Sequence, residues 1–134
     1  MNQPVVRILK PDDLPALEAF LTSRLDSSLF LISNSRQVGV VDHGARYEGT
    51  YAAAFSGEEV LAVTAHYWNG MLIVQAPQFL KEVIAEARRH SARELKGLIG
   101  LDEQVQLAKQ YLAVDRAEYQ IDEADGLYLS LIHI

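Results

Sequence analysis

Three adjacent residues, His66, Tyr67 and Trp68, form the densest group of side chains in this chain that combine a ring with a polar atom. On an extended strand His66 and Trp68 face one side and Tyr67 the other. Such amphipathic side chains near a hairpin end can line a pocket or a domain interface. The alternative is that they fill the two faces of a sheet against helices.

Other candidate groups lack the partners that their chemistry needs. The segment Gly44–Thr50 has the outline of a phosphate loop, with Gly44, Gly49 and Thr50 in place, but has no lysine and precedes a predicted strand. No Gly-x-Ser-x-Gly motif of a serine hydrolase is present. Adjacent acidic pairs fall on predicted caps and turns, which indicates solvated charges: Asp12-Asp13, Glu58-Glu59 and Asp122-Glu123. We therefore find no complete catalytic motif.

Metal and thiol chemistry are also disfavoured. The chain has no cysteine, which excludes a disulfide framework, a thiol nucleophile and a thiolate metal site. Its four histidines, His43, His66, His90 and His133, include no pair at metal-ligand spacing. We expect no metal site.

Composition limits the remaining classes. A length of 134 residues predicts one domain, and 49% hydrophobic with 22% charged residues is ordinary for a globular fold. A formal net charge of -6 repels polyanions, so we expect no nucleic-acid partner. No apolar run approaches the roughly 20 residues of a membrane helix, and no secretory signal is evident. We expect a cytoplasmic protein with no membrane association.

The first half of the chain is predicted to contain a strand, two helices and three antiparallel strands. Aspartate capping starts the first helix, and a serine cap and Gly39 bound the second. The pair Asn69-Gly70 predicts a primed turn with positive φ at both residues. The expected elements are a strand at 5–9, a helix from Pro11 with Leu14, Leu17, Phe20 and Leu21 inward, a helix at 27–38, and strands at 50–55, 60–68 and 71–75.

The second half predicts a helix at about 77–90, a strand at 95–99, a helix at 102–112 capped by Asp102, and a strand at 126–132. The whole order is β-α-α-β-β-β-α-β-α-β. Such an order predicts an α/β fold with a mixed sheet, an antiparallel meander in its first part, and helices on both faces.

This order resembles that of the GNAT superfamily, the acyl-CoA-dependent N-acyltransferases, and lacks only a last strand. Three segments carry the closer likeness: Ser27–Asn34, Arg46–Tyr51 and Ala65–Gly70. Together they resemble the degenerate amino-terminal half of tandem members, in which a catalytic domain follows. The resemblance implies acetyl-CoA as the cofactor of the full-length protein, a second GNAT domain as partner, and a small-molecule or peptide amine as acceptor.

The family holds the cofactor's pyrophosphate in an Arg/Gln-x-x-Gly-x-Gly/Ala loop between its fourth strand and third helix, where backbone N–H groups bind the anion. The corresponding segment here is Gln75–Phe79, which has no glycine or arginine. Pro77 also removes one donor. We therefore expect that this domain binds no cofactor and is not active alone.

A tyrosine on the helix after the fifth strand often protonates the leaving thiolate in this family. Tyr111 lies on the corresponding predicted helix, but the Gly-Phe that the family has shortly afterwards is absent from 113–116. Tyr111 is the single catalytic candidate that the resemblance supplies. The alternative is a packed helical tyrosine.

The last six residues, Leu129–Ile134, look like the in-frame translation of a sequencing adapter. We accordingly expect a GNAT-like amino-terminal domain at 1–128, truncated before its catalytic half, and a non-native tail at 129–134. A genuine strand is the competing interpretation of the tail. The alternative to the whole hypothesis is a stand-alone module of the same fold that binds a small ligand or a protein without transferase activity.

Overall fold

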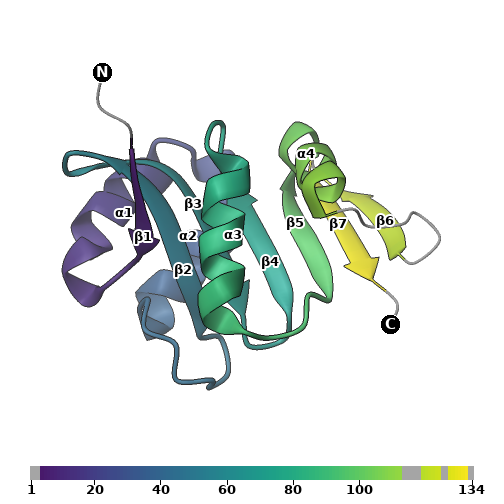
Figure 1. Ribbon diagram of the computed structural model, residues 1–134, viewed down its shortest axis with the longest axis horizontal. Helices are drawn as coiled ribbons and strands as arrows, with labels where there is room; N and C mark the ends of the chain where they lie inside the picture. Colours follow the sequence, from purple (N-terminus) through teal and green to yellow (C-terminus); the bar gives the residue numbers. More distant parts are fainter. Residues whose placement is uncertain (1–3, 113–118, 125–126, 133–134) are drawn as a thin grey trace.

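The computed structural model describes residues 4–112, 119–124 and 127–132, and the side chains of residues 25–27 and of those beyond 112 lie outside this description. Figure 1 shows the path of the chain. The elements are β1 (Val5–Ile8), η1 (Pro11–Asp13), α1 (Leu14–Thr22), α2 (Leu25–Val38), β2 (Gly49–Ser56), β3 (Glu59–Tyr67), β4 (Met71–Gln75), α3 (Leu80–Ser91), β5 (Gly97–Leu101), α4 (Asp102–Leu112), β6 (Tyr119–Ala124) and β7 (Leu127–Ile132).

The strands form one mixed sheet in the order β1-β2-β3-β4-β5-β7-β6. Strands β1 to β4 pair antiparallel with their neighbours, and β4 and β5 pair in parallel. A parallel pair needs a crossover connection, and α3 supplies it. The predicted α/β class, the antiparallel meander and the mixed sheet are confirmed.

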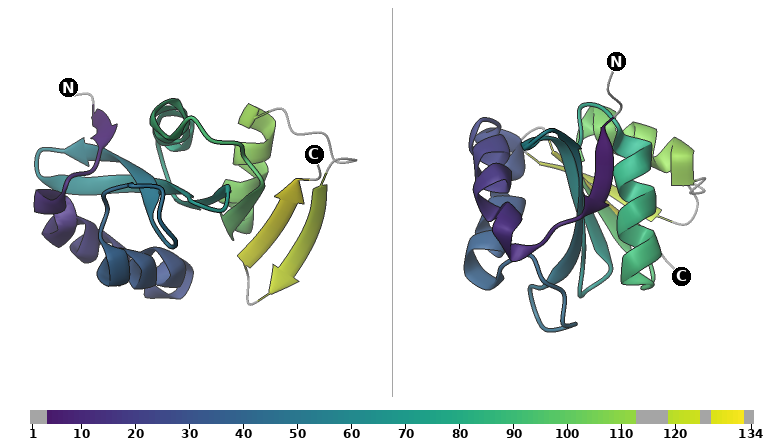
Figure 2. Two further views of the ribbon diagram at one scale, coloured as in Figure 1. Left: turned by 90° about the horizontal axis from the view of Figure 1, so that it is seen from below. Right: turned by 60° about the vertical axis from the view of Figure 1, so that its left-hand side comes forward.

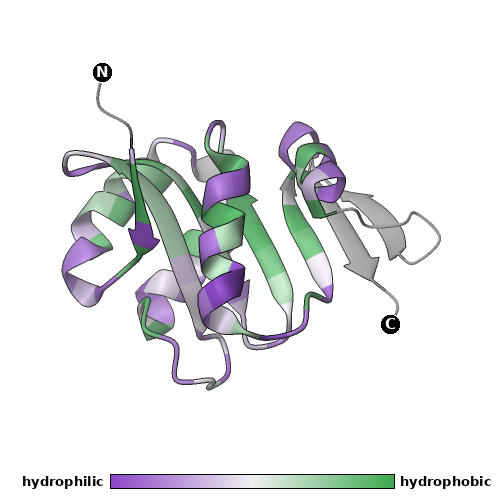
Figure 3. Ribbon diagram, viewed as in Figure 1, coloured by the Kyte–Doolittle hydropathy of each residue, from purple (hydrophilic) through white to green (hydrophobic). Residues whose placement is uncertain are grey.

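Helices cover both faces of the sheet, as predicted. Figure 2 shows α1 and α2 on one side and α3 and α4 on the other. Each side has its own core, because alternate residues of the central strands point to opposite faces. Leu17, Leu21 and Leu31 fill the α1–α2 side, and Val83 and Ile84 fill the α3–α4 side. The hydrophilic residues of α3 lie on the side away from the hydrophobic strands (Figure 3).

The first helical segment begins at Pro11, as predicted, but no aspartate side chain caps the free amides of α1. The Asp13 carboxylate accepts the backbone N–H of Lys10 at 2.8 Å and two hydrogen bonds from the Arg7 guanidinium at 2.7 and 2.8 Å. This aspartate therefore ties β1 to the start of the helix, and the arginine beside it lowers the pKa of the carboxyl.

Two other helix starts were predicted wrongly. Helix α2 begins at Leu25, before the serine that was expected to cap it, and Ser28 is instead buried in the packing. Helix α3 begins at Leu80, three residues after Pro77. Phe79 adopts a left-handed backbone conformation with φ 56°, which cannot continue a helix, so α3 starts after it.

Three further predictions on strands and turns need correction. The turn after β3 has three residues, 68–70, and is closed by a hydrogen bond from the Gly70 N–H to the Tyr67 carbonyl oxygen at 2.8 Å. Only Gly70 has positive φ among these residues, so the predicted two-residue primed turn is wrong. Strand β5 begins at Gly97, two residues later than expected. Strand β6 was missed, because its polar residues show no clear alternation, although the Asp125-Gly126 pair before β7 is a sequence typical of a hairpin turn.

Residues 127–132 form β7 and pair with β5 through the main chain. Backbone pairing does not depend on the origin of a segment. The non-native character of residues 129–134 therefore stays a prediction.

Candidate functional site

The segment between β4 and α3, Ala76–Phe79, offers few backbone donors. The Ala76 N–H donates to Oε1 of Gln104 on α4 at 2.8 Å, in a buried position. Pro77 has no N–H. Phe79 turns its backbone into the left-handed region and packs against the α3–α4 core. Two of the four positions, Ala76 and Pro77, therefore have no N–H to offer to an anion such as a pyrophosphate.

Strands β4 and β5 are closely packed next to this segment. Their paired residues end at Ile73 and Ile99. Just beyond, a side chain at Gly100 would place its Cβ 2.7 Å from Cγ2 and 3.1 Å from the carbonyl oxygen of Val74. Gly100 is therefore required for this close approach.

One buried acceptor at this position has no partner. Gln75 is 2% exposed, and its Oε1 makes no hydrogen bond in the described part of the chain. An unpaired buried carbonyl costs free energy. At the junction of β4 and α3, Gln75 Oε1 is thus a buried acceptor for which the described residues provide no donor.

Tyr111, the candidate acid, lies on α4 and is half-buried against the α3–α4 core. The Lys81 ammonium lies 5.5 Å from the centre of its ring, close enough for a cation–π contact. These contacts describe a tyrosine packed between two helices. Its proposed role in proton transfer stays a prediction.

His66 is fully buried and every polar atom of its ring has a partner. Nε2 lies 3.2 Å from the carbonyl oxygens of Gly70 and Glu94, so it carries the proton. Nδ1 then accepts from the Ser91 hydroxyl at 2.7 Å. Burial lowers the pKa of His66 to about 4, with the charges of Arg93 and Arg88 as further causes. His66 is therefore neutral near pH 7 and joins the β3–β4 hairpin to the end of α3.

A second set of charges supports this end of the sheet. Arg93 donates to the His66 carbonyl oxygen and to Oδ2 of Asp42, both at 2.6 Å. Asp42 Oδ2 also accepts from the Thr50 hydroxyl at 2.7 Å. These hydrogen bonds connect the loop before β2 with the loop after α3. They hold the residues around His66 in place.

Tyr67 and Trp68 lie on the α1–α2 side. The Tyr67 hydroxyl is 2.7 Å from that of Tyr51, and burial raises the pKa of Tyr51 to about 12 and raises that of Tyr67 well above its usual value. The expected alternation holds for His66 and Tyr67 but is wrong for Trp68. Trp68 belongs to the turn and packs edge-to-face against Tyr67 and Tyr47.

In the described part of the chain, the histidines do not gather with acidic residues into a metal-binding group, and Gly49 of the glycine loop has a packing role. The described residues contain no group of three or more His, Asp or Glu side chains that can hold a metal ion. His133 lies outside the described residues. At Gly49 a Cβ would meet the Tyr67 ring at 2.7 Å, so this glycine allows the close approach of two strands.

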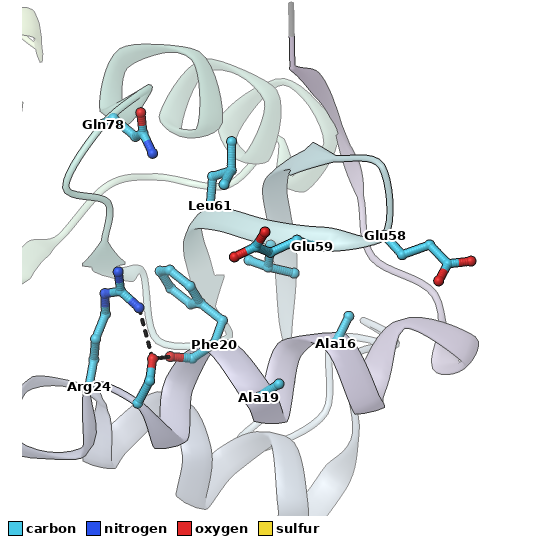
Figure 4. Close-up of a pocket in the computed structure, with 10 residues that line it drawn as sticks. Ala16, Ala19, Phe20, Arg24, Glu58, Glu59, Leu61 and Gln78 are labelled. Carbon is cyan, nitrogen blue, oxygen red and sulfur yellow. Dashed lines mark hydrogen bonds between the residues drawn. The ribbon is translucent and has the colours of Figure 1, made fainter. Parts of the chain in front are cut away.

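A cavity of about 540 Å³ lies between α1 and the start of β3, beside the β4–α3 segment (Figure 4). The Phe20 ring forms part of its wall, and the guanidinium carbon of Arg24 lies 4.4 Å from the ring centre. Figure 4 shows the Glu59 carboxylate directed toward the cavity and that of Glu58 directed away. The lining residues are Ala16, Ala19, Phe20, Ser23, Arg24, Glu58, Glu59, Val60, Leu61 and Gln78.

This cavity was missed by the sequence analysis. Both Glu58 and Glu59 are exposed, as predicted, but Glu59 begins β3 instead of lying in the turn. The strand register shifts nearby, so that Val60 and Ala62 have partners on β2 while Leu61 between them has none. Such a bulge turns a side chain out of the regular alternation. No turn or periodicity signal in the sequence marks it.

No protein-family model matches the chain, and no curated protein sequence is significantly similar to it. Within the described residues, none of the helices has both the length and the apolar character needed to cross a membrane.

Proposed function

We propose that this chain is the non-catalytic amino-terminal domain of a tandem GNAT N-acyltransferase, which packs against a catalytic second domain and helps to shape the cleft for the amine acceptor. In the complete protein the second domain binds acetyl-CoA, and an amine attacks the thioester. The acceptor is a small-molecule or peptide amine.

The element order supports the fold part of this proposal. The resemblance rests on β-α-α-β-β-β-α-β-α-β with one strand lacking, and β6 adds a strand near the end of the order. A parallel β4–β5 pair with its α3 crossover, next to an antiparallel meander, agrees with this resemblance.

The observation that carries the non-catalytic part is the hydrogen bond from the Ala76 N–H to Gln104 Oε1 at 2.8 Å. In a GNAT domain that binds its cofactor, N–H groups of this segment are directed at the pyrophosphate. Here the Ala76 N–H donates to Gln104 on α4, and Pro77 has no backbone N–H to donate. Beside them, Gly100 packs directly against Val74. The Ala76 N–H is thus engaged within the chain, and Pro77 has no N–H, so neither position can donate to a cofactor.

Two measurements test the proposal. The first is to determine the gene sequence that follows the codon for Tyr128, where we expect a second domain with an Arg/Gln-x-x-Gly-x-Gly loop. The second is calorimetry of that full-length protein with acetyl-CoA, for which we expect one bound cofactor per chain and none for this chain by itself. Two cofactors per chain contradict the non-catalytic role, and the absence of any downstream loop contradicts the tandem arrangement.

The cavity at α1 favours a second candidate, a stand-alone module of the same fold that binds a small ligand. The two candidates differ in their dependence on a second domain. A metabolite that binds the isolated chain as tightly as the full-length protein favours the module. In a thiol-release assay both candidates predict no turnover by this chain alone.

A further inference from the structure

The cavity beside α1 combines a cation, a carboxylate and an amide around an apolar wall. These groups come from three separate parts of the chain: Arg24 follows α1, Glu59 begins β3, and Gln78 lies between β4 and α3. In Figure 4 the Arg24 guanidinium and the Gln78 amide lie on one side of the cavity, and the Glu59 carboxylate enters from another. We propose that this cavity binds a free α-amino acid that has an apolar side chain. The proposal goes beyond the acyltransferase function and does not depend on it.

The carboxylate of such a ligand would bind near Arg24. A guanidinium is the cation best suited to a planar carboxylate, because it can donate two parallel hydrogen bonds. Its position is held by stacking on the Phe20 ring at 4.4 Å and by a hydrogen bond from Nη1 to the Ser23 hydroxyl at 2.8 Å. The Gln78 amide adds a neutral donor on the same side.

The ammonium group of the ligand would bind Glu59. This carboxylate makes no ion pair within the described part of the chain, although five other carboxylates do: Asp13, Glu18, Asp42, Glu48 and Glu86. Because Figure 4 shows this exposed carboxylate directed toward the cavity, it can pair there with a ligand cation.

The rest of the wall is apolar. Ala16, Ala19, Phe20, Val60 and Leu61 contribute most of it. The strand bulge places Leu61 here, and Phe20 is only 6% exposed. A ligand with an aliphatic or aromatic side chain would remove from water the part of this wall that is still exposed, which favours binding in proportion to the apolar area buried.

Other ligand classes fit less well. A divalent cation needs several oxygen ligands, and a single carboxylate is directed into the cavity in Figure 4. A phosphate would meet the Glu59 charge and find one cation. A simple amine carries no carboxylate for the Arg24 guanidinium or the Gln78 amide to bind. The zwitterion is the class that uses both charges and the apolar wall.

The test is a titration of the isotope-labelled chain with L-leucine, followed by ¹H–¹⁵N spectra. We expect saturable shifts at the backbone amides of Arg24, Leu61 and Gln78. L-leucinamide, which has no carboxylate, and N-acetyl-L-leucine, which has no ammonium group, should each bind at least about tenfold more weakly, because each loses a charge-assisted hydrogen bond. Glycine, which lacks the side chain, should also bind more weakly.

Matched variants separate the site from general charge effects. Glu59→Gln should weaken L-leucine binding about tenfold or more, and Arg24→Gln should do the same. Glu58→Gln removes the same charge one residue away, where the carboxylate is directed away from the cavity, and should leave the affinity within about twofold. All three positions are exposed, so folding should be unaffected.

The proposal is overturned if L-leucine causes no saturable shift, if the two blocked analogues bind as well as L-leucine, or if Glu58→Gln and Glu59→Gln weaken binding equally. None of these outcomes bears on acetyl-CoA binding by a second domain. Failure of this inference is thus distinguishable from failure of the proposed function.

Discussion

His66 should make the stability of this protein depend on pH between about 4 and 6.5. The ring is 0% exposed and neutral, with its pKa lowered from 6.5 to about 4, first by burial. The unfolded chain takes up a proton as the pH falls below 6.5, whereas the folded chain does not until about pH 4. The stability that His66 contributes is therefore complete above pH 6.5 and is lost as the pH falls through this window.

The size of the effect follows from the pKa difference. A difference of about 2.5 between the unfolded and folded pKa corresponds to about 3 kcal/mol over the whole window. Between pH 7 and pH 5 the same relation predicts a loss of about 2 kcal/mol. The carboxyls with lowered pKa, such as those of Asp13 and Asp42, lose their contribution at lower pH, because their unfolded values lie near 4.

The assay is urea unfolding at pH 7, 6 and 5, with wild type and His66→Gln compared. Glutamine keeps an N–H donor for the Gly70 and Glu94 carbonyl oxygens but does not titrate. The variant should lose less than about 1 kcal/mol between pH 7 and pH 5. His90→Gln, which removes an exposed histidine from α3 that contacts Glu86, is the comparison and should reduce the slope less than His66→Gln does.

Two results would refute this reasoning. One is a wild-type stability that stays constant from pH 7 to pH 5. The other is an equal loss in wild type and His66→Gln, which would mean that the proton uptake occurs elsewhere. Burial of the ring would then not determine its protonation.

Two substitutions test local features in the same urea assay. Ala92 ends α3 with a left-handed backbone angle, φ 52°, which glycine adopts more easily than alanine, so Ala92→Gly should raise the unfolding free energy by about 1 kcal/mol. Ala85→Gly, in the exposed middle of α3, is the control and should lower the unfolding free energy by about as much. A loss of stability at both positions would contradict backbone strain at Ala92. Tyr67→Phe should lower the unfolding free energy by about 1–3 kcal/mol, because the buried Tyr51 hydroxyl loses its partner at 2.7 Å. An unchanged stability of Tyr67→Phe would show that Tyr51 finds another partner.

The buried aromatic and histidine residues show how one short segment can carry two different structural roles. His66 connects the hairpin to α3, and one residue later Tyr67 packs with Tyr51 on the opposite face. The alternation of a strand predicted this separation for the two residues. It failed for Trp68, because the strand ends at Tyr67 and the turn carries Trp68 back to the Tyr67 side.

The sequence by itself determined the class of fold and most of its elements. Local signals were sufficient where the cause is local: the hydrophobic periodicity of α3, and the proline that removes a donor from the β4–α3 segment. The predicted aspartate cap of the first helix was wrong, because the Asp13 carboxylate bonds back to Arg7 and Lys10. The start of α3 was missed, because Phe79 adopts a strained backbone angle that no propensity predicts.

Tertiary structure alone decided how distant residues meet. Gln104 reaches Ala76 across 28 positions, Arg93 reaches Asp42 across 51, and the cavity joins Arg24, Glu59 and Gln78 from three elements. The local sequence of one element does not specify which distant side chains will pack against it in the folded chain. For this reason the sequence could indicate that the segment between β4 and α3 lacks the family's cofactor-binding residues. The hydrogen bond from the Ala76 N–H to Gln104, and the cavity beside this segment, could be found only in the folded chain.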